Sequence, residues 1–309
     1  MRHKVIIDCD NTFGVSGKPI DDGQTIIYLL GRDDIEILGI TTTFGNSTID
    51  DVYPATCWLM EQLGRTDIPV LKGASDYTTG ETEASGFLAE KAAEYPGEIN
   101  LVAIGTMANL KTTWTMNPDF FGNLKQILTM GGYLHRLPYK GWAHVGEVNF
   151  SGAGEAAWQV FRADCPVVIM NAHICFAMPF GQKELDPIAL HDRRQFLIMK
   201  ELLLASAEHL EDAQDYLWDL LPALYISYPE LFNERIVMID STPEEIEEGY
   251  LREGYLREGK TGAEVIMPDH VVDIDRCYRI MYAAWGKITM NQDGPWYDEW
   301  IENWGGNRA

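Results

Sequence analysis

The sequence predicts one α/β domain in which a mainly parallel, open sheet is flanked by helices. Two observations support this fold class. Short β-branched and apolar runs alternate along the chain with amphipathic stretches of helical spacing, the pattern typical of βαβ units. The 309 residues are 46% hydrophobic, and no Pro- or Ser-rich linker interrupts them. We therefore expect a single large domain over residues 1–309, with a Rossmann-like arrangement of its strands.

The N-terminal half contains the clearest predicted elements. Residues 4–8 (K-V-I-I-D) form a short β-branched run typical of a buried strand, and residues 23–30 predict the helix that follows. Residues 35–43 predict a second strand, followed by a helix that begins near residues 47–50 and ends before Gly64. Three further strands are expected from apolar runs at residues 101–104, 126–130 and 166–170.

Helix dominates the expected structure after about residue 185. Residues 196–210 and 219–226 are apolar helical runs, and residues 274–288 keep the spacing of a final packing helix. A Trp-rich tail completes the region 271–309, which we expect to pack on the domain. Its helically spaced tryptophans are Trp296, Trp300 and Trp304. They would dock the tail or form a subunit contact, and the second role fits a homo-oligomer such as a dimer or tetramer.

The composition excludes several kinds of partner. The chain carries 24 basic and 47 acidic residues, a net charge of −23, so it repels phosphate backbones and anionic lipid surfaces. We therefore expect neither nucleic acid nor a membrane as partner, but a divalent cation or a neutral, polyhydroxylated ligand. The five cysteines form no C-x-x-C pair, which favours reduced thiols in a cytoplasmic protein. No apolar run reaches the roughly 18 residues of a membrane-spanning helix.

Four aspartates gather around the first predicted βα loop. Asp8 and Asp10 end the first strand, and Asp21 and Asp22 begin the first helix. Ligands of open α/β sheets bind at the carboxyl ends of the strands, and crowded carboxylates repel one another unless a cation neutralises them. Oxygen ligands without histidine or cysteine indicate Ca²⁺ or Mg²⁺. The alternative is that Asp21 and Asp22 cap the helix N-terminus, which explains part of the cluster but not all of it.

The opening of the sequence fits two enzyme families. The pattern Asp8-x-Asp10-x-Thr12 after a strand resembles the haloacid-dehalogenase-type phosphatases, in which the first aspartate is a nucleophile and the second an acid. The same D-x-D followed by D-D at the next helix resembles the nucleoside hydrolases, which are calcium-dependent N-ribohydrolases. The opening alone leaves both interpretations open.

Later phrases favour the second family. In order they are I-T-T-T-F-G-N at 40–46, A-I-G-T-M-A-N-L at 103–110, M-G-G at 130–132, E-V-N-F at 147–150 with E-A-A at 155–157, and W-D-L-L-P-A at 218–223 leading to Y-P-E-L-F at 228–232. Each phrase is short, but their common order across residues 4–232 is specific. The chain therefore resembles a nucleoside hydrolase. A phosphatase that uses Asp8 and Asp10 remains the alternative enzyme, although no later phosphatase motif is found.

The resemblance implies a metal-centred site. The carboxylates of Asp10, Asp22 and Asp219 and the backbone carbonyl of Ile104 would bind one Ca²⁺. The metal would hold the ribose 2′- and 3′-hydroxyls of a nucleoside and a water beneath C1′. Asp10 would take the proton of that water as general base.

The resemblance also implies the residues that bind the sugar. Asp21, Asn46 and Asn149 would hydrogen-bond the ribose hydroxyls, and Glu147 would hydrogen-bond the 5′-hydroxyl. The anionic pocket would stabilise the positive charge that develops on the sugar ring as the glycosidic bond breaks. The alternative for Asn46 and Asn149 is that they are turn residues at strand ends.

Two departures from the family pattern affect these expectations. Residues 11–19 lengthen the first loop, so they would either reach over the site as a lid or displace Asp21 from the ribose. Trp218 stands where one branch of the family has a histidine that protonates the leaving base. An indole cannot act as that acid, but it can stack on a purine.

The tryptophan resembles the Trp-Asp pair of the purine-specific inosine-adenosine-guanosine branch. Tyr77 or Phe13 would supply the second stacking ring, and the alternative is that Trp218 is a core residue. The sequence thus predicts hydrolysis of the N-glycosidic bond of ribonucleosides, purine ones above all, to free base and ribose. A third interpretation is a non-catalytic protein that binds ribose or nucleosides through a metal.

Overall fold

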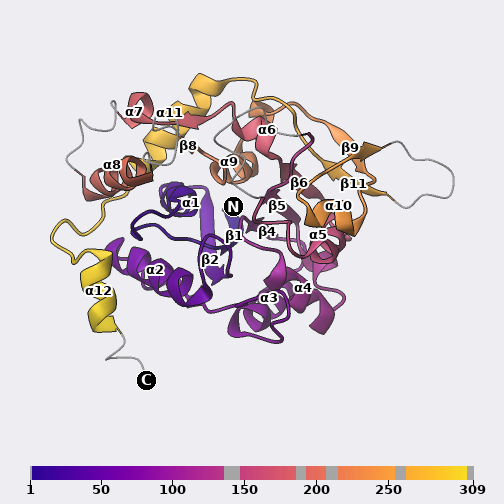
Figure 1. The fold of residues 1–309 in the computed structure, drawn as a ribbon, viewed down its shortest axis with the longest axis horizontal. Coiled ribbons are helices and arrows are strands. Elements are labelled where there is room, and N and C mark those ends of the chain that lie inside the picture. The colour runs from indigo at the N-terminus through magenta and orange to yellow at the C-terminus, as the bar shows by residue number, and fades with distance from the viewer. Residues whose placement is uncertain (1, 136–146, 186–192, 207–214, 255–261, 305–309) are drawn as a thin grey trace.

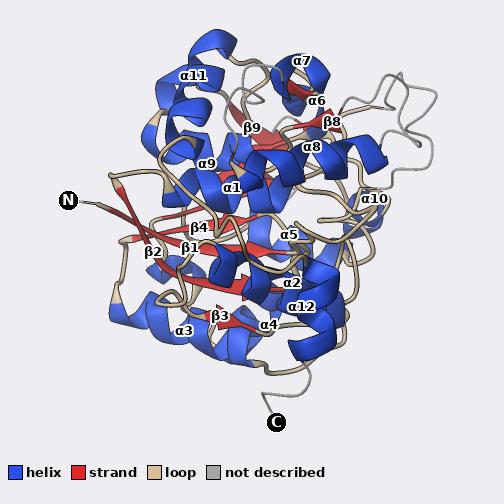
Figure 2. Cartoon of the chain, turned by 90° about the vertical axis from the view of Figure 1, so that its left-hand side faces the viewer, coloured by secondary structure: helices blue, strands red, loops and turns tan. Residues whose placement is uncertain are grey.

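A nine-stranded sheet forms the centre of the computed structural model, which describes residues 2–135, 147–185, 193–206, 215–254 and 262–304. The strand order is β10-β9-β11-β6-β5-β4-β1-β2-β3, so that β3 and β10 lie at the two edges (Figures 1 and 2). The strands are β1 His3–Cys9, β2 Ile35–Thr42, β3 Val70–Leu71, β4 Ile99–Ala103, β5 Gln126–Met130, β6 Val167–Met170, β9 Ile236–Ile239, β10 Glu253–Gly254 and β11 Ala263–Ile266. Pairing is parallel from β3 through β6 to β11, and antiparallel where β9 meets β10 and β11. The predicted fold class, a mainly parallel sheet flanked by helices, is confirmed.

Helices cover both faces of the sheet, because side chains alternate between the faces along each strand. Val5 and Ile7 of β1 point into one hydrophobic cluster, and Ile6 between them points into the other. The first cluster is covered by α1 Asp21–Leu30, α2 Ile49–Gln62, α9 Leu220–Ser227 and α11 Ile274–Trp285. The second is covered by α3 Glu83–Glu94, α4 Ala108–Met116 and α5 Gly154–Phe161, with α10 Pro243–Glu247 beside α5 (Figure 1).

The sequence analysis locates the strands β1, β2, β4, β5 and β6 to within two residues but misses β3, and it expects mainly helix after residue 185. Helix does predominate there among the described residues, but the sequence analysis missed the strands β9, β10 and β11, which lie at one end of the sheet. The signals are present in the sequence. Ile236–Ile239 is an unbroken apolar run, and Ala263–Ile266 alternates buried and exposed residues, as expected for a half-buried strand.

Three helices and a small two-stranded sheet lie between β6 and α9 in the described ranges. α6 Ala172–Cys175 follows β6, and α7 Gln182–Leu185 and α8 Arg194–Ser206 follow later. Between them, β7 Pro179–Phe180 pairs antiparallel with β8 Asp215–Tyr216 in a separate two-stranded sheet. The helix predicted over residues 196–210 is confirmed as far as Ser206, and its last four residues lie outside the described ranges.

The C-terminal region packs on the N-terminal helices. The indole N–H of Trp285 in α11 donates to the carbonyl of Gln24 in α1 at 3.0 Å. The last helix, α12 Tyr297–Trp304, lies on α2, where the Trp58 and Tyr297 ring centroids are 5.9 Å apart and the Trp300 indole donates to Glu61. The tryptophans of this helix therefore dock the tail, and the homo-oligomer stays a prediction. None of the described helices is long and apolar enough to cross a bilayer.

Candidate active site

Asp8 ties together the carboxyl ends of the central strands. Its Oδ1 accepts hydrogen bonds from the Thr41 hydroxyl at 2.5 Å and from the Asn109 amide at 2.8 Å, and its carbonyl accepts from the Ile104 N–H at 2.8 Å. The side chain is fully buried, which raises its pKa to about 7 against the lowering effect of both hydrogen bonds. A carboxylate enclosed in this way has no access to a phosphoester, so the nucleophile that the phosphatase interpretation requires is missing.

Asn46 links Asp10 to Asp22. Its backbone N–H donates to Asp10 Oδ2 at 2.7 Å, and its side-chain amide donates to Asp10 Oδ1 at 3.2 Å and to Asp22 Oδ2 at 3.0 Å. Gly45 makes this approach possible, because its φ is +156° and a Cβ there would lie 1.8 Å from Asp10 Oδ2. Asn46 is therefore more than a turn residue: it fixes the spacing of two carboxylates that come from different elements.

Three carboxylates converge at the start of α1 and the start of α9. Each of Asp21, Asp22 and Asp219 offers an oxygen atom within 4.8 Å of the other two. All three are at most 8% exposed, and none of the ion pairs within the described ranges involves them. We call these residues together with Asp10 the acidic group. Burial, followed by repulsion from neighbouring carboxylates, raises the pKa of Asp22 and of Asp219 well above the usual range.

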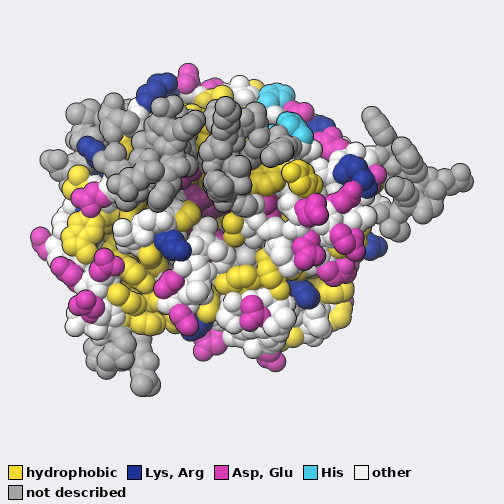
Figure 3. All heavy atoms as spheres, viewed as in Figure 1, with side chains coloured by type: hydrophobic (Ala, Val, Ile, Leu, Met, Phe, Trp, Pro, Cys, Tyr) yellow, Lys and Arg dark blue, Asp and Glu magenta, His cyan; other side chains and the backbone are white. Residues whose placement is uncertain are grey.

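The acidic group fits a hard divalent cation. Its donors are carboxylate oxygens, and Asp21 Oδ1 is buried without a hydrogen-bond partner among the described atoms. The predicted backbone ligand is also nearby. Ile104 precedes Gly105, whose missing Cβ would lie 3.0 Å from the Asp10 nitrogen. Acidic side chains also outnumber basic ones over the face shown in Figure 3, in keeping with the net charge of −23.

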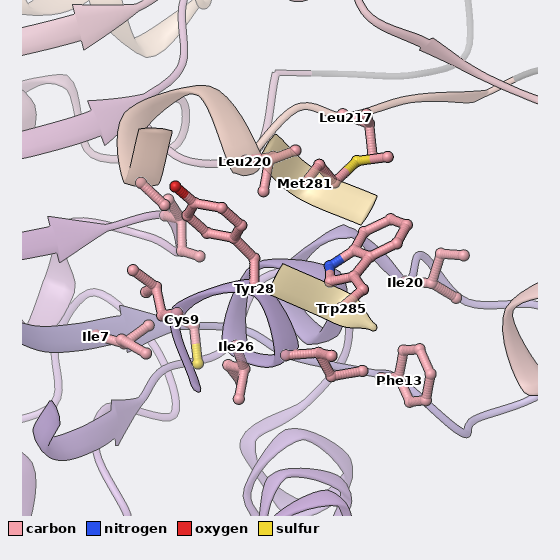
Figure 4. Packing of buried hydrophobic residues seen from close by; sticks show 14 of the residues in the cluster. Ile7, Cys9, Phe13, Ile20, Ile26, Tyr28, Leu217, Leu220, Met281 and Trp285 are labelled. Carbon is pink, nitrogen blue, oxygen red and sulfur yellow. The ribbon is translucent and has the colours of Figure 1, made fainter. Parts of the chain in front are cut away.

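The first residues of the inserted loop 11–19 are buried in the core. Phe13 is fully buried and lies among core side chains in Figure 4. The Asn11 amide donates to the Thr56 hydroxyl at 3.2 Å, and the Thr12 hydroxyl donates to the Pro19 carbonyl at 2.8 Å. Phe13 therefore lies in the core and supplies no stacking ring for a base. With this loop in place, Asp21 still lies within the acidic group, beside Asp22 and Asp219.

The Glu147 carboxylate fixes the backbone of the residues that follow it, 149–151. It accepts backbone N–H groups from four residues: Gly132, Asn149, Phe150 and Ser151. Burial raises the pKa of Glu147 to about 7, and these hydrogen bonds oppose the rise. The Asn149 amide in turn donates to the Met130 carbonyl at the end of β5, at 3.1 Å. Glu147 and Asn149, two of the predicted sugar-binding residues, thus lie at the carboxyl edge of the sheet, where each already has a backbone hydrogen-bond partner.

Tyr77 connects this segment to the acidic group. Its hydroxyl donates to the Ser151 carbonyl at 2.5 Å, and its ring meets Phe44 edge-on with centroids 4.8 Å apart. Burial raises the Tyr77 pKa, and the charges of Glu147 and Asp10 raise it further. The phenol therefore lies within electrostatic reach of both carboxylates.

Buried neighbours in sequence hold the backbone of the Trp218–Asp219 pair in place. Leu217 and Leu220 are buried in the first hydrophobic cluster (Figure 4), which fixes the chain on both sides of the Trp-Asp pair. Trp218 itself is partly exposed, and its indole N–H donates to Asp215 Oδ1 at 3.0 Å. Its ring meets Phe176 and Tyr216 edge-on, with centroids 5.4 and 5.3 Å away. We call Phe176, Tyr216 and Trp218 the aromatic cluster.

Sequence reasoning missed Phe176 and Asp215. Phe176 follows α6, about forty residues before Trp218, and no local pattern connects the two. Asp215 stands three residues before Trp218, but acidic residues also occupy positions 211, 212 and 219, so the sequence does not single it out.

The comparison with known families agrees with this geometry. The family model for inosine-uridine preferring nucleoside hydrolases matches residues 5–278. The chain belongs to this family.

Individual relatives are more distant. Uridine nucleosidase 1 of Arabidopsis thaliana is 29% identical over 212 residues, which cover 60% of this chain and 60% of that protein. The matched segments of this and the next relatives span 60–65% of the relatives' own length.

Solved structures share the fold over most of the chain. A plant nucleoside hydrolase superposes with a TM-score of 0.77 at 21% identity, covering 92% of this chain and 99% of the other. A purine-preferring ribonucleoside hydrolase from Gardnerella vaginalis gives the same TM-score at 20% identity, covering 92% and 98%. At these identities the likeness concerns the fold.

Proposed function

We propose that this protein is a calcium-dependent nucleoside N-ribohydrolase, which cleaves the N-glycosidic bond of a ribonucleoside to give free base and ribose. The observation that carries the proposal is the acidic group, buried at the carboxyl edge of a nucleoside hydrolase fold. Crowded, buried carboxylates repel one another unless a cation neutralises them, so the presence of four in one site argues for metal binding.

Asp10, Asp22, Asp219 and the Ile104 carbonyl would hold the calcium ion. When bound, the ion orients the ribose hydroxyls and lowers the pKa of an attacking water. Asp10 accepts the proton of that water, and the Asn46 hydrogen bonds hold its carboxylate in position for this step. Asp21 lies beside the ligands, and its buried Oδ1, which has no hydrogen-bond partner among the described residues, suits a ribose hydroxyl.

The remaining polar residues would bind the sugar. Asn46 and Asn149 are assigned to ribose hydroxyls, and Glu147 is assigned to the 5′-hydroxyl. The two Glu147 oxygens offer about four lone-pair sites for four backbone donors, so the 5′-hydroxyl would take the place of a weak one, such as the Gly132 N–H at 3.3 Å. As the glycosidic bond lengthens, positive charge develops on the sugar ring, and the surrounding carboxylates stabilise it.

Trp218 supports a preference for purine nucleosides. It directly precedes Asp219, and a stacked indole would stabilise a purine as its ring nitrogen gains a proton. The relatives differ in this respect, since one is named a uridine nucleosidase and another a purine-preferring hydrolase. The base preference therefore rests on the tryptophan and not on the comparisons.

The decisive experiment measures release of base and reducing sugar from inosine, guanosine, adenosine, uridine and cytidine, with Ca²⁺ and with chelator. We expect release that needs Ca²⁺ and is fastest for the purines. Release of phosphate from phosphoesters without base release would support the phosphatase instead. If no substrate is cleaved over hours but calorimetry detects Ca²⁺-dependent nucleoside binding, the protein is a binder and the proposal fails.

A further inference from the structure

Asp215 is held in place by the main chain around it. It lies in β8, where it is paired with Phe180 of β7, and two residues later the Leu217 N–H donates to the Met178 carbonyl at 2.9 Å. The Tyr216 N–H donates to Asp215 Oδ1 at 2.8 Å, which orients the carboxylate. The short two-stranded sheet thus fixes both the backbone and the side chain of Asp215.

The same oxygen receives the indole N–H of Trp218, at 3.0 Å. The indole is therefore restrained in two ways: its N–H is bound to a fixed acceptor, and its ring is enclosed edge-on by the other members of the aromatic cluster. Those two rings also contact each other, with the Phe176 and Tyr216 centroids 4.8 Å apart at an interplanar angle of 74°. A cluster of three mutually tilted rings leaves the indole little freedom to rotate.

The arrangement connects the aromatic cluster to the acidic group. Trp218 and Asp219 are adjacent in sequence, so the indole and a proposed calcium ligand share one short backbone segment. Asp215 is also close enough to the acidic group to raise the pKa of Asp21, second only to burial as a cause. A displacement of the indole would therefore affect the part of the site where the base is joined to the ribose of the substrate.

We propose that Asp215 is a positioning residue for the leaving base: by holding the Trp218 N–H, it presents the indole face at the angle that stacks on the purine. This inference rests on the proposed function. Stacking requires a defined ring plane, and an indole that loses its acceptor would rotate to satisfy its N–H elsewhere. Asp215 would thus act on bond cleavage through Trp218, without touching the substrate.

The test compares two leaving groups in the Ca²⁺-loaded protein. Inosine needs its departing base stabilised, whereas 4-nitrophenyl β-D-ribofuranoside releases a phenolate that leaves without protonation. For Asp215→Ala we expect a roughly tenfold lower kcat on inosine, the effect of one lost hydrogen bond, and a change of less than twofold on the nitrophenyl riboside. Asp215→Asn, which keeps an acceptor oxygen for the indole, should recover most of the kcat on inosine. Asp67→Asn, at an exposed ion pair, is the matched control.

A double variant shows whether Asp215 acts through the tryptophan. Combining Asp215→Ala with Trp218→Ala should be no slower on inosine than Trp218→Ala alone. Independent, multiplying losses would overturn the proposal, and so would equal losses on both substrates for Asp215→Ala, because they would indicate a general structural role. A wild-type protein that cleaves neither substrate would overturn the proposed function itself, and this is seen before any variant is made. Thermal unfolding of each variant with Ca²⁺ separates loss of kcat from loss of fold.

Discussion

The two ends of the proposed site are built from different kinds of structure. In the acidic group, Asp10 follows β1 of the main sheet, and the other three aspartates stand at the starts of α1 and α9. Asn46 bridges two members by donating hydrogen bonds to both Asp10 and Asp22. The aromatic cluster lies at short elements, just after α6 and in and after β8, and is held by ring contacts and one hydrogen bond to Asp215.

The difference separates chemistry from selectivity. Catalytic carboxylates need fixed spacing, which the parallel strands provide because their carboxyl ends meet at one edge. Base recognition can vary among relatives without disturbing that spacing if it is carried by short, separately paired segments. Substitutions at the acidic group should therefore affect every substrate, and substitutions at the aromatic cluster should affect only some.

The largest expected effect is at Asp10. Asp10→Asn keeps an acceptor for the Asn46 N–H but removes the proposed base, so kcat should fall by about 10²–10⁴-fold on all nucleosides. Steady-state rates on inosine and uridine measure this, with circular dichroism to show an unchanged fold. A variant that keeps a tenth of the wild-type rate would show that Asp10 is not the base.

The second prediction concerns metal and pH. Burial raises the pKa of Asp10 to about 8 and that of Asp21 to about 7 in the metal-free protein. The charge of Asp21 adds to the rise at Asp10, and the charge of Asp215 adds to the rise at Asp21. A carboxyl group with a raised folded-state pKa stabilises the fold fully below its unfolded value near 4. That contribution is lost as pH rises toward 7–8, by up to ~1.4 kcal/mol per pH unit for each group.

The temperature of half-unfolding, measured in chelator, should therefore be lower at pH 8 than at pH 5.5. Ca²⁺ binds the ionised carboxylates, so it should raise this temperature more at pH 8 than at pH 5.5. Differential scanning calorimetry at both pH values, with Mg²⁺ as a second ion, measures the effect. An equal Ca²⁺ shift at both pH values would mean that the ion binds elsewhere.

The sequence could bring Asp10 and Asn46 together because both follow predictable strands. Asp10 and Asn46 stand directly beyond β1 and β2, so the topology alone brings them to one edge. Sequence reasoning could not foresee that Phe13 enters the core or that Asp215 accepts the Trp218 indole. Both depend on side-chain packing between segments far apart in the chain or on strands of two residues, which leave no periodic signal.

The third prediction tests the aromatic cluster. Base stacking contributes about 1–3 kcal/mol, so Trp218→Ala should lower kcat/KM on inosine by about 10–100-fold, whereas Trp218→Phe, which keeps a ring, should lower it less than fivefold. The loss on uridine should be smaller than the loss on inosine. Trp114→Phe, on the opposite face of the sheet, is the control. Equal effects of alanine and phenylalanine would exclude stacking.

The smallest expected effect is at Tyr77, which joins the Phe44–Asn46 segment to the segment held by Glu147. Tyr77→Phe removes the hydrogen bond to the Ser151 carbonyl but keeps the ring contact with Phe44. A single hydrogen bond contributes about 1 kcal/mol, so KM should rise roughly fivefold with kcat nearly unchanged, for purine and pyrimidine nucleosides alike. A loss confined to purines would instead assign Tyr77 to the base, as a second stacking ring opposite Trp218, and would place part of the selectivity on the main sheet.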